Sequence, residues 1–399
     1  MNKQAEENRN QIKKSMKDNS IMIVFSGNTV KSSADVEYPF VVNRNFYHLT
    51  QINEPNLILV ISKEADILFI EKSDEMFEKW VGKKISKKQA SKKSNIEDIH
   101  YLEDFDGSIY NNFDSIYLDL EKDQFNSYLT PALQFQQENK IHALDAYPIV
   151  AKSRSIKDKP EVDKMLEAIE TTRIGLESIM RNLEPNMKES YFEAHFDFVL
   201  KKENVIHAFD TIAASGTNAT TLHYVTNNEV AKDNELILFD LGATSDLYCA
   251  DISRTYPVNG KFTERQKELY QMVLDANEMT IKEIKPGVTM QELNDRVVKF
   301  YAKELKRLNV IEESSQVKDY YYHGVSHSLG LDTHDIGLTR DEQLVAGNVI
   351  TVEPGIYIKE EGIGIRIEDN ILVTKKGNVN LSKNIIKTIS DIEEFMANE

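Results

Sequence analysis

Short apolar runs separated by polar stretches dominate the first part of the chain. Runs of strand length rich in isoleucine, leucine and valine predict β-strands, and they lie at Ile21–Phe25, Leu57–Ile61, Ile67–Ile70 and Ser115–Leu118. Helices are expected between and around these runs, at Asn2–Met16, Glu75–Trp80 and Phe125–Asn139. The mixture predicts a mixed α/β domain over residues 1–155.

A polar break at Lys157–Pro160 separates this region from one with long amphipathic helices. Pro160 can occupy a first helical turn. Two sets of apolar positions follow at helical spacing, namely Val162, Met165, Leu166 and Ile169, then Tyr191, Phe192, His195, Phe196, Val199 and Leu200. We interpret His195 as a packed residue rather than a ligand.

Thr263 and Thr289 each stand three residues before a glutamine or glutamate, which is the pattern of a capping box that opens a helix. Strands are expected at Val349–Glu353 and Ile363–Val373. Residues 160–399 are therefore predicted to form an α+β domain.

The segment Leu236–Thr255 is predicted to form a β-hairpin with one aspartate on each arm. Its expected turn lies around Ser245, so Asp240 and Asp251 are predicted to face each other with Cβ atoms roughly 5 Å apart. Two carboxylates opposed on a half-buried sheet repel each other. The pair must therefore share a proton or hold a cation.

Composition and charge restrict the classes of protein that fit. A chain of 399 residues predicts more than one domain. The formal net charge of −17 argues against a general nucleic-acid or anionic-membrane partner. No apolar run approaches the roughly 20 residues that span a bilayer, and the polar N-terminus lacks the apolar core of a secretory signal. A cytoplasmic location is therefore expected, with no membrane partner.

Two local features modify this picture. The single cysteine, Cys249, excludes an intrachain disulfide and a thiolate-cluster zinc site, and it is interpreted as a small buried residue. The segment Lys79–Lys93 is strongly basic within an acidic chain. It is interpreted as a solvated surface, and a phosphate-binding patch is the alternative.

Later segments supply more groups that can bind a cation. Glu353 ends an apolar strand before Pro354-Gly355, and Arg366 and Glu368 alternate with isoleucines on a further strand. The four negative charges of Asp240, Asp251, Glu353 and Glu368 balance the charge of two divalent cations, and one imidazole completes this ligand set. Oxygen ligands favour Mn, Mg or Ca, and histidine shifts the preference toward Mn, Fe, Co or Zn. Two such ions about 3.5–4 Å apart can share a hydroxide and polarise a carbonyl, which is machinery for hydrolysis.

The order of these groups resembles that of the pita-bread metallopeptidases, and within them that of aminopeptidase P and prolidase. The resemblance rests on FDLGA, CADISRTYPV, HGVSHSLGLDTHD, TVEPGIY and GIRIEDN. It implies an α+β fold in which a pita-bread catalytic domain follows a smaller mixed α/β N-terminal domain. It also implies that Asp240 chelates one metal, that Asp251 and Glu368 bridge both, and that His327 and Glu353 complete the other. The expected metal is Mn²⁺, with Co²⁺ or Zn²⁺ as alternatives.

The same resemblance implies roles for residues around the metals. His223 and His334 would handle substrate and protons, and His323 would line a proline pocket. Arg366 and Tyr357 would lie in the outer shell of the metal site.

In the N-terminal domain the segment SADVEYPF looks like that of aminopeptidase P. There Asp35 would join Arg366 and Tyr357 in the relay that this family forms between an arginine and a tyrosine. Trp80 would reach a neighbouring subunit's active site, or else pack as an ordinary core or interface residue. The first reading implies a homodimer or homotetramer.

The resemblance thus predicts an Xaa-Pro aminopeptidase, which releases the first residue from peptides with proline second. A metal-bridging hydroxide would attack, and Glu353 would carry the proton to the leaving nitrogen. A prolidase, which cleaves Xaa-Pro dipeptides, is the alternative, since the connection IKEE between Tyr357 and Gly362 is short. More remote alternatives are a metal-free binding protein and a creatine-hydrolysing relative, and the complete ligand set argues against both.

Overall fold

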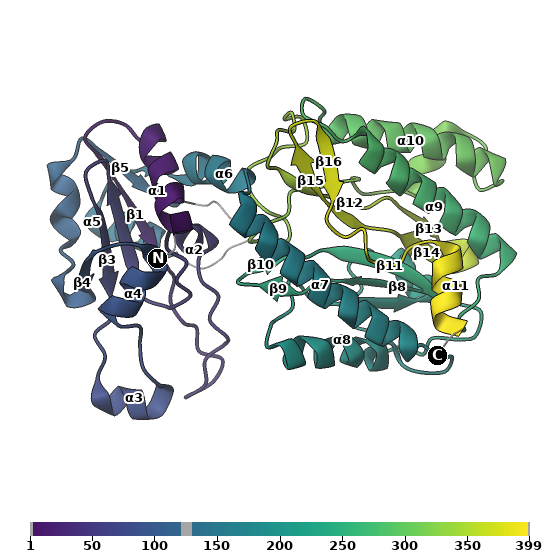
Figure 1. Cartoon of the computed structure of the whole chain (residues 1–399), viewed down its shortest axis with the longest axis horizontal. Coiled ribbons are helices and arrows are strands. Elements are labelled where there is room, and N and C mark those ends of the chain that lie inside the picture. Colours follow the sequence, from purple (N-terminus) through teal and green to yellow (C-terminus); the bar gives the residue numbers. More distant parts are fainter. Residues whose placement is uncertain (1–2, 121–129, 398–399) are drawn as a thin grey trace. The chain divides into compact units, whose positions relative to one another are not determined.

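A computed structural model describes residues 3–120 and 130–397 and separates the chain into two compact units, Met1–Arg154 and Ser155–Glu399. Figure 1 shows both units, with the N-terminal one in purple and blue and the C-terminal one in teal to yellow. The division falls close to the polar break at Lys157–Pro160. None of the described helices is both long and apolar enough to cross a membrane.

The N-terminal unit is built on a six-stranded sheet in the order β4-β3-β2-β1-β5-β6. Its strands are β1 (Ser20–Phe25), β2 (Ile58–Ser62), β3 (Asp66–Ile70), β4 (Asp98–Tyr101), β5 (Ser115–Leu118) and β6 (Leu144–Asp145). The central strands β1, β2 and β3 pair antiparallel, whereas β5 joins β1 in parallel. The four predicted strands are confirmed. The strand β4 was not predicted, because its sequence DIHY has no continuous apolar run.

Helices pack around this sheet, and their bounds are α1 (Lys3–Ser15), α2 (Arg44–Thr50), α3 (Glu75–Val81), α4 (Lys87–Ser94), α5 (Pro131–Asn139) and α6 (Tyr147–Ser155). The predicted helix Phe125–Asn139 is confirmed from Pro131 onward, and its first five positions lie outside the described residues. One core cluster joins Ile21, Val60 and Leu118 of the sheet to Phe135 of α5. The apolar runs therefore form a buried layer.

All lysines of the basic segment Lys79–Lys93 except Lys79 line a recess of about 1110 Å³ in this unit, together with glutamates that include Glu54 and Glu71. Lys84 forms an ion pair with Glu71. Acidic neighbours thus offset part of the positive charge. The solvated surface and the phosphate-binding patch both remain predictions.

In the C-terminal unit, helices pack against several short sheets. The helices are α7 (Lys159–Arg181), α8 (Glu189–Glu203), α9 (Glu264–Glu283), α10 (Met290–Arg307) and α11 (Ile389–Ala397). Helix α7 packs on the short strands Thr244–Ser245 and Tyr248–Cys249, and α8 packs on the strand Ile212–Ser215. Helix α9 packs on the strands Val349–Val352, Gly355–Ile358 and Ile363–Arg366. The predicted capping boxes at Thr263 and Thr289 are confirmed, each with its reciprocal pair of hydrogen bonds. Together the two units confirm the predicted α+β class.

The strands of this unit fall into four sheets, β11-β8-β7, β10-β9, β12-β15-β16 and β13-β14. Their bounds are β7 (Ile212–Ser215), β8 (Leu236–Leu241), β9 (Thr244–Ser245), β10 (Tyr248–Cys249), β11 (Ile252–Pro257), β12 (Val349–Val352), β13 (Gly355–Ile358), β14 (Ile363–Arg366), β15 (Asp369–Thr374) and β16 (Gly377–Asn380).

The predicted hairpin is present, but its predicted register is wrong. Asp240 pairs with Ser253 rather than with Asp251. The turn is centred on Asp246 and Leu247, whose φ angles of 45° and 68° are both positive, as the two central residues of a type I′ turn require. This moves the centre of the turn one residue along the chain. Asp251, two residues before Ser253, is then a diagonal neighbour of Asp240 on the same face.

The predicted strand Ile363–Val373 is also corrected, because it is two strands. β14 pairs with β13, whereas β15 pairs with β12 and β16. The chain changes sheets at Ile367 and Glu368. This break places Glu368 between two sheets, where its side chain can meet groups from several elements.

Candidate metal centre

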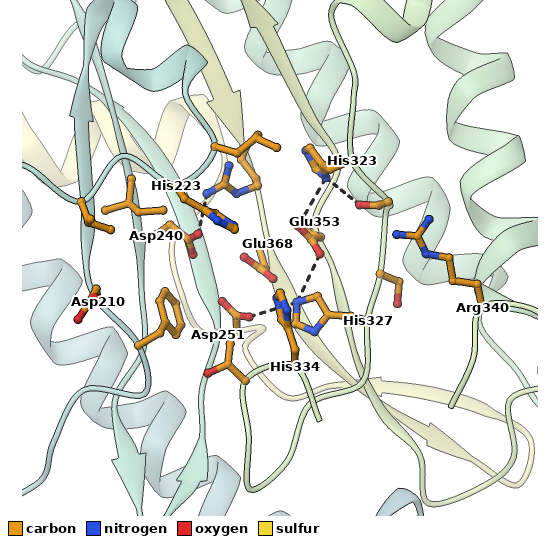
Figure 2. A pocket seen from close by; sticks show the side chains of 18 residues that line it. Asp210, His223, Asp240, Asp251, His323, His327, His334, Arg340, Glu353 and Glu368 are labelled. Atoms are coloured by element: carbon orange, nitrogen blue, oxygen red, sulfur yellow. Dashed lines mark hydrogen bonds and ion pairs between the residues drawn. The ribbon is translucent and has the colours of Figure 1, made fainter. Parts of the chain in front are cut away.

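A cavity of about 610 Å³ in the C-terminal unit collects the predicted ligands. Acidic and imidazole side chains lie together in its lining, and Figure 2 shows Asp251, His327, Glu353 and Glu368 turned toward one another. Its lining residues are Phe209, Asp210, Ile212, Leu222, His223, Val225, Asp240, Asp251, His323, Gly324, Ser326, His327, Thr333, His334, Arg340, Glu353, Arg366 and Glu368.

Four of the five candidate ligands stand where a strand ends or begins. Asp240 lies near the end of β8 and Asp251 directly before β11. Glu353 directly follows β12, and Glu368 lies between β14 and β15. His327 belongs to an irregular segment whose backbone N–H groups and carbonyls bond to Thr351 of β12. Strands therefore fix the backbone of every ligand.

The ligand atoms lie close enough to share a cation. His327 Nε2 is 3.3 Å from Asp251 Oδ2 and 3.4 Å from Glu353 Oε1. One ligand atom each from Asp251, His327 and Glu368 lies within 4.8 Å of the others. Such spacing suits a common metal ion rather than direct hydrogen bonds between carboxylates.

Burial makes this cluster unfavourable without a cation. Asp251 is 4% exposed and Glu368 is 2% exposed. Burial, reinforced by the neighbouring carboxylates, raises the pKa of Glu353 to about 7 and the pKa of Glu368 well above its ordinary value. Burial is also the main reason that the pKa of Asp251 is raised. Bound cations would reverse this effect by favouring the ionised forms.

Two buried oxygen atoms point to the same conclusion. Asp240 Oδ1 and Glu368 Oε1 have no hydrogen-bond partner among the described residues. Buried carboxylate oxygens are normally satisfied, because an unpaired one costs free energy. Four carboxylates and one imidazole form a donor set that divalent Mn, Co or Zn accepts. The residues present therefore fit divalent metal ions.

His327 has the tautomer that a metal ligand needs. Its Nδ1 lies 3.0 Å from the carbonyl oxygen of Ser328, which can only accept, so Nδ1–H donates and Nε2 is left facing the carboxylates. Burial alone would lower the pKa of His327, but the bond to Asp251 and the charge of Glu353 raise it to about 9. In the protein without metal this imidazole is therefore protonated, and a bound metal ion would take the place of the proton on Nε2.

Arg366 connects the metal cluster to the wall of the cavity. Its Nη2 donates to Asp240 Oδ2 at 2.6 Å, and its Nη1 donates to Tyr357 Oη at 2.9 Å. Its Nε donates to Ser253 Oγ at 2.7 Å, and Ser253 in turn donates to Glu368 Oε2 at 2.7 Å. A single guanidinium thus orients Asp240 directly and Glu368 through Ser253.

The predicted wall residue His323 has both ring nitrogens occupied. Its Nδ1 lies 2.7 Å from the carbonyl oxygen of Gly324 and its Nε2 lies 2.8 Å from Tyr357 Oη. Because the Gly324 carbonyl can only accept, Nδ1 carries the proton of the ring, so the Tyr357 hydroxyl donates to His323 Nε2. Burial lowers the pKa of His323 to about 3, so the ring is neutral. It offers a ring surface to the cavity rather than a polar atom.

The other two histidines, His223 and His334, line the cavity from two separate irregular segments. The ring of His334 lies 4.2 Å from that of His327. Burial and the neighbouring charge of His327 lower the pKa of His334 to about 4, so it is neutral near pH 7. His223 is exposed and belongs to the irregular segment after β7. Both side chains are labelled beside the carboxylates in Figure 2.

Several lining residues were not predicted. Arg340 and Asp210 bring charge to the cavity, and Phe209, Leu222 and Val225 bring apolar surface. No motif singles these residues out, because they come from irregular segments. Conversely, Asp35 and Trp80 belong to the N-terminal unit, where both are exposed and Trp80 is 84% exposed. Their predicted roles remain predictions.

Comparison with known families decides the classification. Residues 163–375 match the family model "Metallopeptidase family M24", and residues 5–116 match "Aminopeptidase P, N-terminal domain". The chain belongs to metallopeptidase family M24. The M24 match includes all five candidate ligands, from Asp240 to Glu368.

Relatives of this M24 chain match it over nearly its whole length. The Xaa-Pro aminopeptidase of Haemophilus influenzae is 33% identical, with 98% of this chain and 96% of the relative covered. That of Escherichia coli is 31% identical, with 96% and 94% covered. Among solved structures, a Bacillus anthracis chain assigned to aminopeptidase P has a TM-score of 0.96 and 44% identity, with 99% and 98% covered. Aminopeptidase P of E. coli with the inhibitor Pro-Leu has a TM-score of 0.90 and 29% identity, with 99% and 98% covered.

Proposed function

We propose that this protein is a metal-dependent Xaa-Pro aminopeptidase. One observation supports this most: four carboxylates and His327 line one cavity, and two of their buried oxygens have no hydrogen-bond partner among the residues that the structure describes. The cavity belongs to an M24 chain whose full-length relatives are named Xaa-Pro aminopeptidases. The predicted main activity is thus favoured over the prolidase alternative and over a non-catalytic binding protein.

The proposed ligand assignment follows the sequence prediction. Asp240 would serve one ion, Asp251 and Glu368 would bridge both, and His327 and Glu353 would complete the second. When bound, two divalent ions supply a hydroxide nucleophile at neutral pH and polarise the scissile carbonyl. Mn²⁺ is the proposed ion, with Co²⁺ or Zn²⁺ as alternatives.

The chain's own residues would bind the peptide and move protons. Glu353 would hand a proton to the leaving proline nitrogen, since its carboxyl borders the cavity beside the other ligands. His223 and His334 would hydrogen-bond the substrate around the scissile bond. The ring surface of His323 suits the apolar proline ring. Arg340 places a positive charge at the cavity wall, where a peptide carboxylate could bind.

A length series of peptides tests the activity. The purified protein with Mn²⁺ should release the first residue from Xaa-Pro-Yaa and longer peptides faster than it cleaves Xaa-Pro. A strong preference for the dipeptide would favour a prolidase instead. If no divalent ion supports cleavage of any of these peptides, the proposal is contradicted.

Metal content separates the roles of the two aspartates. Asp251→Ala should disrupt both metal sites, because Asp251 is the proposed bridge, whereas Asp240→Ala should spare one. Elemental analysis of the two purified variants measures this difference. Equal metal retention in both variants would contradict the assignment.

We further propose a cytoplasmic homodimer or homotetramer, in which Trp80 reaches the active site of a neighbouring subunit. The support is the 84% exposure of this large aromatic side chain, since exposed aromatic residues are enriched at interfaces. Light scattering of the wild type and of Trp80→Ala would show whether the oligomer depends on this residue. A monomeric wild type would contradict the proposal.

A further inference from the structure

The segment that carries His223 lacks regular structure for most of its length. It leaves β7 at Ser215, passes through one 3-10 turn (Gly216–Thr220), and continues without helix or strand to Glu229. His223 itself is exposed, and its neighbours Leu222 and Val225 line the cavity. A catalytic histidine on such a segment needs an external support, because the segment's own backbone gives little rigidity.

Glu189, at the start of helix α8, supplies that support. This side chain is fully buried, and its carboxylate accepts five hydrogen bonds. Oε1 accepts from the Ser215 backbone N–H at 2.8 Å, from Ser215 Oγ at 2.8 Å and from Asn218 Nδ2 at 2.9 Å. Oε2 accepts from Tyr224 Oη at 2.8 Å and from the Glu229 backbone N–H at 3.0 Å.

These donors lie on both sides of His223 in the sequence. Ser215 and Asn218 precede it, Tyr224 is its immediate neighbour, and Glu229 follows it. A carboxylate has about four lone-pair positions, so five donors saturate Glu189. The carboxylate thus fastens both ends of the segment to one point on a rigid helix.

A second contact from the same helix supports this arrangement. Glu193, one helical turn after Glu189, accepts a hydrogen bond at 3.0 Å from Asn227. Asn227 also donates to the carbonyl of Thr211, just before β7, and accepts from the backbone N–H of Ala213 within β7. Residues four apart lie on the same helix face. Helix α8 therefore presents two carboxylates to the segment.

We propose that Glu189 is the positioning residue of His223: its carboxylate holds the segment 216–229 so that the imidazole lies over the cavity. The inference rests on the proposed function, since the effect of Glu189 is exerted through His223 on a bound peptide. Glu189 lies outside the cavity lining and is proposed neither as a ligand nor as a group that touches substrate.

The test compares Glu189→Gln with Glu161→Gln in the metal-loaded full-length protein. A glutamine at 189 keeps one accepting oxygen but turns an NH₂ group toward donors, so the Glu229 or Ser215 backbone N–H loses its partner. Glu161 is the matched control, because it is a buried first-turn glutamate of helix α7 that accepts from Tyr248. Glu189→Gln should lower kcat/KM on the order of tenfold to a hundredfold, with metal content unchanged, whereas Glu161→Gln should leave kcat/KM near wild type.

A double-mutant cycle distinguishes positioning from a general loss of structure. If Glu189 acts through His223, the Glu189→Gln change should have little further effect on kcat/KM in a His223→Ala protein. Equal effects of Glu189→Gln in both backgrounds would overturn the inference. So would a His223→Ala protein with wild-type activity.

A milder variant keeps the inference testable if Glu189→Gln does not fold. Tyr224→Phe removes only one of the five hydrogen bonds, and it should lower kcat/KM by a smaller factor in the same direction. Hydrogen exchange should show faster exchange of the 216–229 amides in Tyr224→Phe and Glu189→Gln, with strand β8 unchanged. Unchanged exchange and activity would contradict the inference, whereas an inactive wild type would contradict the proposed function instead.

Discussion

At the scale of single residues, Ser253 links two charged groups of the site although no motif pointed to it. It donates to Glu368 Oε2 and accepts from Arg366 Nε, both at 2.7 Å, and it is fully buried. Within the described part of the chain, Glu368 already has one oxygen without a hydrogen-bond partner. Loss of the serine hydroxyl would leave the other oxygen free as well, so the carboxylate could rotate away from its metal-binding position.

Ser253→Ala should therefore weaken divalent metal binding by about 10- to 100-fold, the range found when a group that orients a ligand is removed. Competition with a fluorescent chelator measures the affinity. Ser328→Ala is the control, because Ser328 is also buried near the site but its hydroxyl has no hydrogen-bond partner among the described residues. Equal affinities in the two variants would refute the role of Ser253.

At the scale of elements, the hairpin depends on a close approach of its two arms at Gly242. A Cβ atom at this position would lie 1.9 Å from the carbonyl oxygen of Ala250, which belongs to the backbone and cannot move aside. Asp240 and Asp251 stand on either side of this contact. The distance between the two arms therefore sets the distance between two proposed ligands.

Gly242→Ala should lower the free energy of unfolding by about 2–3 kcal/mol through overpacking and should also reduce metal content. Urea unfolding and elemental analysis measure the two effects. In Gly377→Ala, a Cβ atom would have no neighbour within 4 Å, so both quantities should stay near wild type. A Gly242→Ala protein with wild-type stability and metal content would show that the arms can separate without consequence.

The connection between β13 and β14 is short, and an ion pair between Glu361 of this connection and Arg265 holds it to helix α9. Arg265 on α9 donates to both carboxylate oxygens of Glu361, at 2.9 and 2.7 Å. The hydrogen bond from Arg265 lowers the pKa of Glu361. A carboxyl with a lower pKa in the folded than in the unfolded state stabilises the fold above the unfolded pKa of about 4.3. That contribution disappears as the pH falls through the lower folded value.

Glu361→Gln should therefore cost up to about 1 kcal/mol at pH 7, since both side chains are about one-third exposed and water screens the pair. The cost should shrink as the pH falls below about 4.3 and vanish once the pH lies below the lowered pKa of Glu361. Urea unfolding of both proteins across this pH range gives the difference. Glu360→Gln, an exposed neighbour, should show no such difference, and a cost that stays constant with pH would exclude the ion pair as its source.

At the scale of the whole molecule, local patterns predicted what depends on local sequence. The strand Ser115–Leu118 and the helix that begins after Thr263 follow from apolar runs and capping residues, and both were predicted. Asp251, Glu353 and the other proposed ligands could be named because each lies in a short motif.

Features that depend on pairing between distant segments could not be predicted. The I′ turn at Asp246 and Leu247 shifted the register, because leucine rarely adopts a positive φ and gave no turn signal. The carboxylate of Glu189 meets Glu229 only after α8 packs beside β7. Ser253 and Glu368 likewise meet only in the folded unit.

The central claim is that divalent metal held by these five side chains cleaves Xaa-Pro peptides. The most direct measurement is a titration of the metal-free protein with Mn²⁺, followed by release of the first residue from an Xaa-Pro-Yaa peptide. Activity should be absent without metal and should rise until two equivalents per chain are bound. Full activity in the metal-free protein, or no activity at any metal concentration, would contradict the account.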